Sequence, residues 1–160
     1  MTLMGCTGHQ SLSPATRRLL AATIASTLAA DGNDNLVGVT SLAEGADQIF
    51  AFAVLAAGGQ LHAVIPSNGY EQGFQSVEAR QTYTALLDLT ANTTTLGFDT
   101  PTEDAYLTAG HHVADNCDIL LAVWDGQEAA GKGGTADIVS YARDQGRDTR
   151  IIWPPGASRG

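Results

Sequence analysis

One segment, residues 117–124 (CDILLAVW), constrains the fold more than any other part of the chain. Only Asp118 interrupts its apolar side chains, so the segment does not alternate between an apolar and a polar face. A strand of this composition is buried on both faces, which is typical of a central strand in a parallel sheet covered by helices. We therefore expect a parallel sheet between two layers of helices.

The rest of the chain alternates between short apolar runs and segments with apolar residues at helical spacing. Further strands are expected at residues 1–6, 36–40, 61–65, 93–98 and 151–153. Helices are expected from Pro14 to the stop at residues 31–33, and at residues 46–57, 76–89, 102–116 and 135–145. This order predicts an α/β fold: a single Rossmann-like three-layer sandwich with a mostly parallel sheet.

A chain of 160 residues suits one domain. We expect this domain to cover residues 1–155 and residues 156–160 to form a loose C-terminal tail. The sequence has no long apolar run and no charged N-terminal region followed by an apolar one. It therefore predicts no membrane span and no signal peptide, which makes the cytoplasm the expected location.

The formal net charge of the chain is −9. Proteins that bind a long phosphate backbone carry a basic face, so this charge predicts that nucleic acid is not a partner. A small anionic ligand is not excluded, because the amides of a loop bind such a ligand locally.

The cysteines and histidines do not form a metal-binding pattern. Cys6 and Cys117 fall in expected strands without CxxC spacing, so we interpret them as buried small hydrophobic residues, with a disulfide or a metal site as the minor alternative. His111 and His112 are adjacent within an expected helix and point in different directions. We therefore predict no metal and no cofactor.

Four loops that combine glycine with polar side chains follow expected strands. In an open α/β sheet, ligands bind beyond the carboxyl ends of the strands, so these loops predict a binding site at one end of the sheet. The candidate ligand-binding residues are Thr7, Gly8, His9, Ser41, Glu44, Gly45, Asp47, Pro66, Gly126, Lys132, Gly133, Gly134 and Thr135.

Residues 126–132 fit the first seven positions of the P-loop pattern GxxxxGK[ST], but Gly133 stands where Ser or Thr should hold Mg²⁺. A P-loop also normally follows the first strand, whereas this segment comes near the end of the chain. We therefore interpret it as a different anion-binding loop. Its glycines let backbone N–H groups approach an anion, and the helix that begins at Thr135 favours negative charge. Lys132 either adds a positive charge there or is solvated.

Two aspartates flank this loop and are the candidate catalytic residues. Asp137 lies in the first turn of the expected helix, where it either stabilises the helix dipole or points into the site as an acid, base or nucleophile. Asp125 follows the central strand and has the same two interpretations, of which we favour the functional one because strand-end carboxylates face the cleft.

Other loop residues also have two interpretations. His9 is either an exposed histidine or a contact to a phosphate or base. Glu44 and Asp47 either stabilise the dipole of the helix that follows them or bind ribose hydroxyls. Tyr70 either stacks on a base or covers the edge of the sheet.

The segments GCTGH at residues 5–9, SLAEGAD at 41–47, VIP at 64–66 and GGTAD at 133–137 resemble the SLOG superfamily of Rossmann-like proteins. This group includes the Lonely Guy phosphoribohydrolases and the core domain of the DNA-processing protein of natural transformation. The resemblance covers about residues 3 to 153. It implies a nucleotide or a nucleotide-derived ligand held by the first strand-end loop and the GGT loop.

The catalytic pattern of the phosphoribohydrolases, which is similar to PGGxGTxxE together with an arginine, is altered here. Lys132 replaces the proline, the spacer before Thr135 is shorter, and Asp137 is the nearest acid. Arg80 is the only arginine in the middle third of the chain. Residues 125–126 with 134–137 also resemble, in outline, the nucleoside 2-deoxyribosyltransferases, in which a glutamate is the nucleophile.

These observations favour a module that binds or senses a nucleotide-like ligand. The first alternative is an N-glycosidic hydrolase of nucleoside monophosphates, with Asp137 as acid or base, or a deoxyribosyltransferase-like enzyme. The second is a scaffold that has kept the fold without the ligand. The resemblance also implies a homo-oligomer, such as a homodimer, because related proteins often dimerise through helices that flank the sheet.

Overall fold

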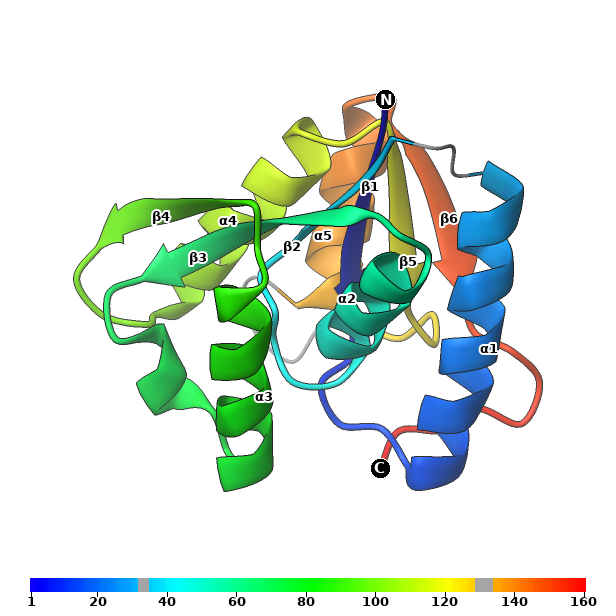
Figure 1. The fold of residues 1–160 in the computed structure, drawn as a ribbon, viewed down its shortest axis with the longest axis horizontal. Coiled ribbons are helices and arrows are strands. Elements are labelled where there is room, and N and C mark those ends of the chain that lie inside the picture. Colours follow the sequence, from blue (N-terminus) through cyan, green and yellow to red (C-terminus); the bar gives the residue numbers. More distant parts are fainter. Residues whose placement is uncertain (32–34, 129–133) are drawn as a thin grey trace.

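The computed structural model describes residues 1–31, 35–128 and 134–160, and within them six strands form one sheet. All neighbouring strands are parallel, in the order β4-β3-β2-β1-β5-β6 (Figure 1). The strands are β1 (Thr2–Gly8), β2 (Leu36–Thr40), β3 (Gln60–Ser67), β4 (Asn92–Phe98), β5 (Ile119–Val123) and β6 (Asp148–Ile152). The sheet confirms the α/β fold class.

Helices cover both faces of this sheet. They are α1 (Pro14–Asp31), α2 (Ala46–Ala56), α3 (Val77–Asp88), α4 (Glu103–Asp115) and α5 (Thr135–Asp144), with a short 3₁₀ helix, η1 (Tyr70–Gly73). Leu20 of α1, Phe50 of α2 and Leu86 of α3 belong to one apolar cluster, whereas Val113 of α4 and Ile138 of α5 belong to a second. The two clusters are the two layers of core that the apolar central strand predicted.

The order of the strands shows at which edge of the sheet a ligand of an open α/β fold is expected. The chain moves outward from β1 through β2 and β3 to β4, then returns to the other side of β1 as β5. The direction of strand order therefore reverses between β1 and β5, whose ends align at Gly8 and Val123. Ligands of open α/β sheets bind in the crevice outside such a switch point.

Two strands extend further at their carboxyl ends than the sequence predicted. Thr7 and Gly8, expected in a turn, pair with Ala122 and Val123 as the end of β1. Pro66, expected to end β3, lies within it. The missing N–H of proline is tolerated there, because the described pairing of β3 with β2 stops at Ala63 and its pairing with β4 shifts register between Ile65 and Ser67.

Residues 156–160 contact the main body of the structure, although the sequence suggested a loose tail. The N–H of Ser158 donates to Thr16 Oγ1 at 2.7 Å, and Arg159 forms an isolated bridge with Leu12. These contacts bring the end of the described chain back to the start of α1, beside the carboxyl ends of the strands (Figure 1).

Cys6 and Cys117 are buried and carry free thiols, as predicted. None of the described helices has both the length and the apolar character needed to cross a bilayer.

Candidate functional site

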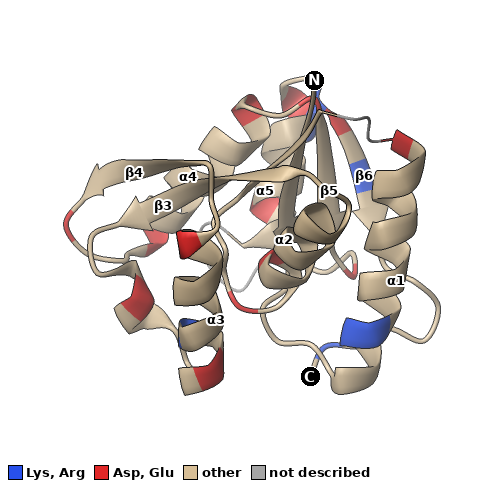
Figure 2. Ribbon diagram, viewed as in Figure 1, with Lys and Arg blue, Asp and Glu red and all other residues tan. Residues whose placement is uncertain are grey.

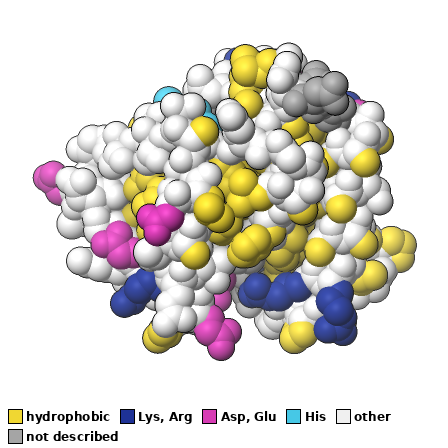
Figure 3. All heavy atoms as spheres, viewed as in Figure 1, with side chains coloured by type: hydrophobic (Ala, Val, Ile, Leu, Met, Phe, Trp, Pro, Cys, Tyr) yellow, Lys and Arg dark blue, Asp and Glu magenta, His cyan; other side chains and the backbone are white. Residues whose placement is uncertain are grey.

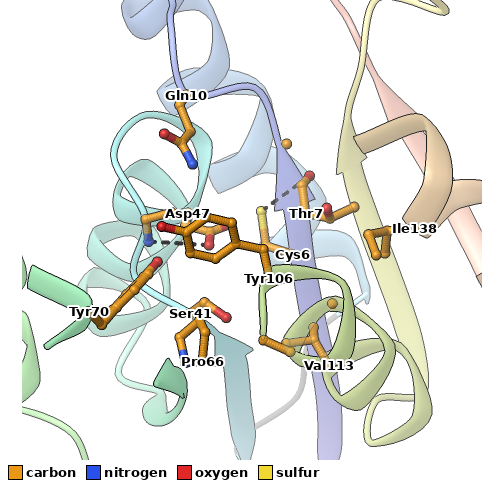
Figure 4. A pocket seen from close by; sticks show the side chains of 14 residues that line it. Cys6, Thr7, Gln10, Ser41, Asp47, Pro66, Tyr70, Tyr106, Val113 and Ile138 are labelled. Carbon is orange, nitrogen blue, oxygen red and sulfur yellow. Dashed lines mark hydrogen bonds between the residues drawn. The ribbon is translucent and has the colours of Figure 1, made fainter. Parts of the chain in front are cut away.

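Three neighbouring hollows, which share some of their lining residues, lie over the carboxyl ends of the strands. The central hollow is partly open to solvent, and its lining includes Cys6, Thr7, Ser41, Asp47, Pro66, Tyr70 and Tyr106 (Figure 4). The aromatic hollow is lined by Gln10, Ala43, Glu44, Tyr70, Gly73, Phe74, Gln75 and Tyr106. The α5 hollow is lined by Thr7, Gly8, His9, Gln10, Gln127, Glu128, Gly134, Thr135, Ala136 and Arg159. Shared residues place the central hollow between the other two.

Asp47 is the buried acid of the central hollow, with 8% of its surface exposed. Desolvation raises the pKa of its carboxyl group from 3.8 to about 7, although hydrogen bonds from the backbone of Ala43 and the side chain of Thr40 act in the opposite direction. A carboxylic acid that titrates near neutral pH inside a pocket is suited to give and take protons.

The loop before α2 is shaped to present donors to this carboxylate. Leu42 has a φ of 58°, a left-handed conformation that is uncommon for a residue other than glycine, and Gly45 has a φ of 87°. The N–H of Ala43 then donates to Asp47 Oδ2 at 3.3 Å, and the N–H of Ser41 also donates to Asp47. The SLAEGAD segment thus supplies backbone hydrogen bonds to the carboxylate of its own aspartate.

Cys6 lies beside Asp47 on the floor of the same hollow (Figure 4). Burial raises the pKa of its thiol well above the usual value, and the neighbouring carboxylate raises it further. The thiol therefore stays protonated, and its Sγ lies 3.8 Å from the carbonyl oxygen of Thr7 and 3.9 Å from that of Ala46, either of which accepts its hydrogen. Cys6 is a hydrogen-bond donor in the pocket as well as a buried small residue.

Aromatic side chains surround the aromatic hollow. The Tyr70 ring is in edge contact with Phe74, Tyr83 and Tyr106, with ring centroids 5.1, 5.4 and 6.3 Å away. Tyr106 reaches from α4 across the central hollow toward Asp47 and Tyr70 (Figure 4). Tyr70 itself is 4% exposed and packs in the core as well as lining the hollow.

The α5 hollow combines the start of a helix with a guanidinium group. Gly134 is the N-cap residue of α5, and Thr135 begins the helix, so backbone N–H groups of the first turn are directed toward this hollow. Arg159 lines the same hollow. Both features suit an anionic group such as a phosphate.

Asp125 is held by partners on two sides. The Arg159 guanidinium contacts both of its carboxylate oxygens, at 2.6 and 2.9 Å, and the N–H of Gln127 donates at 3.0 Å. Partial burial alone would raise the pKa of Asp125, but these hydrogen bonds lower it to about 2. Asp125 is therefore an ionised anchor for Arg159 rather than a proton donor at neutral pH.

His9 connects the ends of β1 and β5. Its Nε2 atom lies 3.1 Å from the N–H of Asp125 and 3.2 Å from the carboxylate of that residue, and its ring is in edge contact with Trp153. Burial lowers the pKa of His9, which favours the neutral ring with Nε2 as acceptor of the Asp125 N–H. One edge of the ring is thus occupied within the protein.

Some predicted site residues have evident structural duties. A Cβ atom on Gly8 would lie 2.5 Å from Ala46 Cβ, and one on Gly45 would lie 2.5 Å from the carbonyl oxygen of Gln10. Both glycines are therefore required for close packing between β1 and α2, whether or not a ligand binds. Gly126 has a φ of 85° with open space around it and serves the turn after β5.

Asp137 is exposed and lines none of the three hollows. Its place in the first turn of α5 matches the helix-dipole interpretation. Lys132 and Gly133 lie outside the described residues. The remaining predicted residues line at least one hollow: Thr7, Gly8, His9, Ser41, Glu44, Asp47, Pro66, Gly134 and Thr135.

The sequence analysis missed Gln10, Tyr106 and Arg159 as lining residues, and missed Cys6 as a polar one. Gln10 directly follows the predicted GCTGH segment, so its position was a usable signal. Tyr106 lies on a helix and Arg159 near the end of the chain, and neither belongs to a strand-end loop.

The charge of the surface is unevenly distributed. Arg17 and Arg18 lie near the start of α1, and Arg159 lies close to the same end of that helix. Figure 2 shows basic residues at the base of α1 and beside the C-terminus, and Figure 3 shows basic side chains along the lower edge of the molecule. A chain with a net charge of −9 therefore still carries arginines near the carboxyl ends of its strands.

No protein-family model and no curated protein matches the sequence. Solved structures match the fold. DNA processing protein A (DprA) from Streptococcus pneumoniae superposes with a TM-score of 0.69 at 19% identity, over 98% of this chain and 52% of that one. DprA from Helicobacter pylori superposes with a TM-score of 0.68 at 15% identity, over 99% of this chain and 68% of that one. The protein TM1055 superposes with a TM-score of 0.60 at 18% identity, over 93% of this chain and 72% of that one.

The chain thus shares its fold with the two DprA proteins and with TM1055, and it spans about half the length of the S. pneumoniae protein. The prediction that nucleic acid is not a partner is wrong, because the H. pylori protein of the same fold is described as binding single-stranded DNA. The prediction failed because net charge averages over the whole surface, whereas binding depends on the charge near one edge.

Proposed function

We propose that this protein binds a nucleotide or a nucleotide-derived ligand along the three hollows, with the phosphate in the α5 hollow. The observation that carries the proposal is that three neighbouring hollows, which share lining residues, lie at the switch point between β1 and β5. At one end, the first turn of α5 supplies N–H donors, and Arg159, whose guanidinium is ion-paired with Asp125, supplies its remaining N–H groups.

The test is a panel of nucleoside mono-, di- and triphosphates and a short single-stranded oligodeoxynucleotide, measured by thermal stabilisation and calorimetry. The oligonucleotide is included because the H. pylori protein binds single-stranded DNA. Gly134 lines the α5 hollow and is the N-cap residue of α5, so Gly134→Val adds bulk at the expected phosphate position and should lose the stabilisation. Gly97→Val is the matched control, because a Cβ atom there meets nothing within 4 Å. No stabilisation by any member of the panel would leave the scaffold interpretation.

A second candidate is the N-glycosidic hydrolase, which Asp47 favours. Its buried carboxyl group has a pKa of about 7, so both protonation states are populated near neutral pH. Protonated Asp47 would give its proton to the departing base nitrogen as the bond to C1′ breaks, and water would add to C1′ and return a proton to the carboxylate.

This candidate places the acid and base role on Asp47 in the central hollow rather than on the exposed Asp137. Chromatography for free base after incubation with each nucleoside monophosphate tests it. Release that is lost in Asp47→Asn and kept in Asp137→Asn supports it, and release lost only in Asp137→Asn refutes the assignment.

A further inference from the structure

The aromatic hollow contains a carboxylate among its aromatic side chains. Glu44 lines it together with Tyr70, Phe74 and Tyr106. Flat aromatic side chains are the usual contacts of nucleic-acid bases, and a single polar group among them commonly selects which base binds.

The Glu44 carboxylate has a fixed orientation. Ser76 Oγ donates to Glu44 Oε1 at 3.1 Å, and the same Ser76 Oγ accepts the N–H of Ala79 at 3.0 Å as the N-cap of α3. A side chain held by the cap of a helix presents its free lone pairs in one direction, which makes it suited to select a ligand.

An ionised glutamate has acceptors and no donors. Of the common bases, guanine presents two neighbouring donors on one edge, its N1–H and its exocyclic amino group. Adenine and cytosine place a ring-nitrogen acceptor beside their amino group, so a carboxylate repels part of that edge. Gln10 and Gln75 line the same hollow, and their side-chain amides carry N–H donors of the kind that the guanine oxygen accepts.

From this arrangement we propose that the aromatic hollow is a guanine-binding subsite and that Glu44 is the residue that selects the base. The proposal rests on the proposed nucleotide-binding function. It adds the identity of the base and the residue that reads it.

The first experiment compares the affinities of GMP, IMP, AMP and CMP for the unmodified protein by calorimetry. All four carry the same ribose and phosphate, so differences report on the base. IMP keeps the N1–H of guanine and lacks the amino group. We expect GMP to bind at least about tenfold more tightly than IMP, and AMP and CMP to bind more weakly still.

The second experiment repeats the series with Glu44→Gln. The glutamine has one acceptor where the carboxylate had two oxygens, so the affinity for GMP should fall at least about tenfold and the preference for GMP over AMP should disappear. Glu78→Gln is the matched control, because Glu78 is exposed in the first turn of α3 and lines none of the hollows. The control should keep the preference.

The results separate this inference from the proposed function. Equal affinities for the four monophosphates, or a guanine preference that survives in Glu44→Gln, would overturn the guanine subsite and leave nucleotide binding intact. Binding of none of them, together with no response to the wider nucleotide panel, would overturn both. The comparison of GMP with IMP uses the unmodified protein, so it decides the matter even if the variant does not fold.

Discussion

Asp47 should make the stability of this protein fall as the pH rises toward neutrality. Its pKa is about 7 in the folded protein, against a reference value of 3.8. Between these values the native state holds a proton that the unfolded state has released, so raising the pH favours unfolding. Above a pH of about 7 both states are ionised and the effect is complete. From about pH 5 to about pH 8, Asp47 should lower the free energy of unfolding by about 3 kcal/mol.

The measurement is urea unfolding at both pH values, followed by the fluorescence of the two tryptophans. Asn resembles the protonated acid in shape and does not titrate, so Asp47→Asn should lose this pH dependence. His9 and His62 have lowered pKa values and act in the opposite sense, stabilising the protein as pH rises. The comparison is therefore between the pH dependences of the wild type and the variant.

Asp144→Asn is the matched control, because Asp144 is an exposed aspartate at the end of α5. It should keep the pH dependence of the wild type. If Asp47→Asn also keeps it, to within about 1 kcal/mol, then Asp47 is ionised at low pH in the native state. That result would refute the reasoning from burial and remove the support that Asp47 gives to the hydrolase.

Three further predictions concern the frame of the site. Gly45→Ala should lower the free energy of unfolding by about 3 kcal/mol in the same urea assay, because its Cβ atom meets backbone oxygens. Gly58→Ala is the control: Gly58 has a similar φ but open space around it, so the free energy of unfolding should fall by only about 1 kcal/mol. Arg159→Ala should lower the free energy of unfolding by about 1 kcal/mol at neutral pH, because Arg159 and its partner Asp125 are both partly exposed. Urea unfolding should show this difference vanish as the pH falls from 3.8 toward 2, because Asp125 is then protonated. Cys6 should react with iodoacetamide far more slowly than it does in urea, as followed by mass spectrometry, because burial raises the pKa of its thiol.

The fold was largely predictable because its signals are local. The apolar run that ends at Val123 and the caps at Ser13, Ser76 and Thr102 depend on neighbouring residues in the chain. The errors fell at strand ends, where pairing with a distant strand decides the outcome. Thr7 and Gly8 continue β1 because β5 is long enough to pair with them, which no residue near position 8 reveals.

The role of Asp47 was only partly predictable. The SLAEGAD segment marked it as a site residue, but its raised pKa comes from burial, which the N–H donors presented by the left-handed turn at Leu42 only partly offset. A left-handed leucine is uncommon, and sequence pattern does not predict it. The sequence of this segment did not distinguish Glu44 from Asp47. In the structure, Asp47 is buried beside Cys6 in the central hollow, whereas Glu44 lines the aromatic hollow among aromatic rings.

The two ends of the site come from different kinds of structure, and this makes the proposals separable. The α5 hollow depends on Arg159, which lies 34 residues from its partner Asp125, in a segment that the sequence suggested to be loose. The aromatic hollow depends on Glu44 and Ser76, which are fixed by the cap of α3. Loss of Arg159 should therefore lower the affinity for all nucleotides by the same factor, because all of them carry the phosphate. Loss of the Glu44 carboxylate should instead change which base is preferred. A variant that changed both properties together would show that the hollows do not act as two subsites of one ligand.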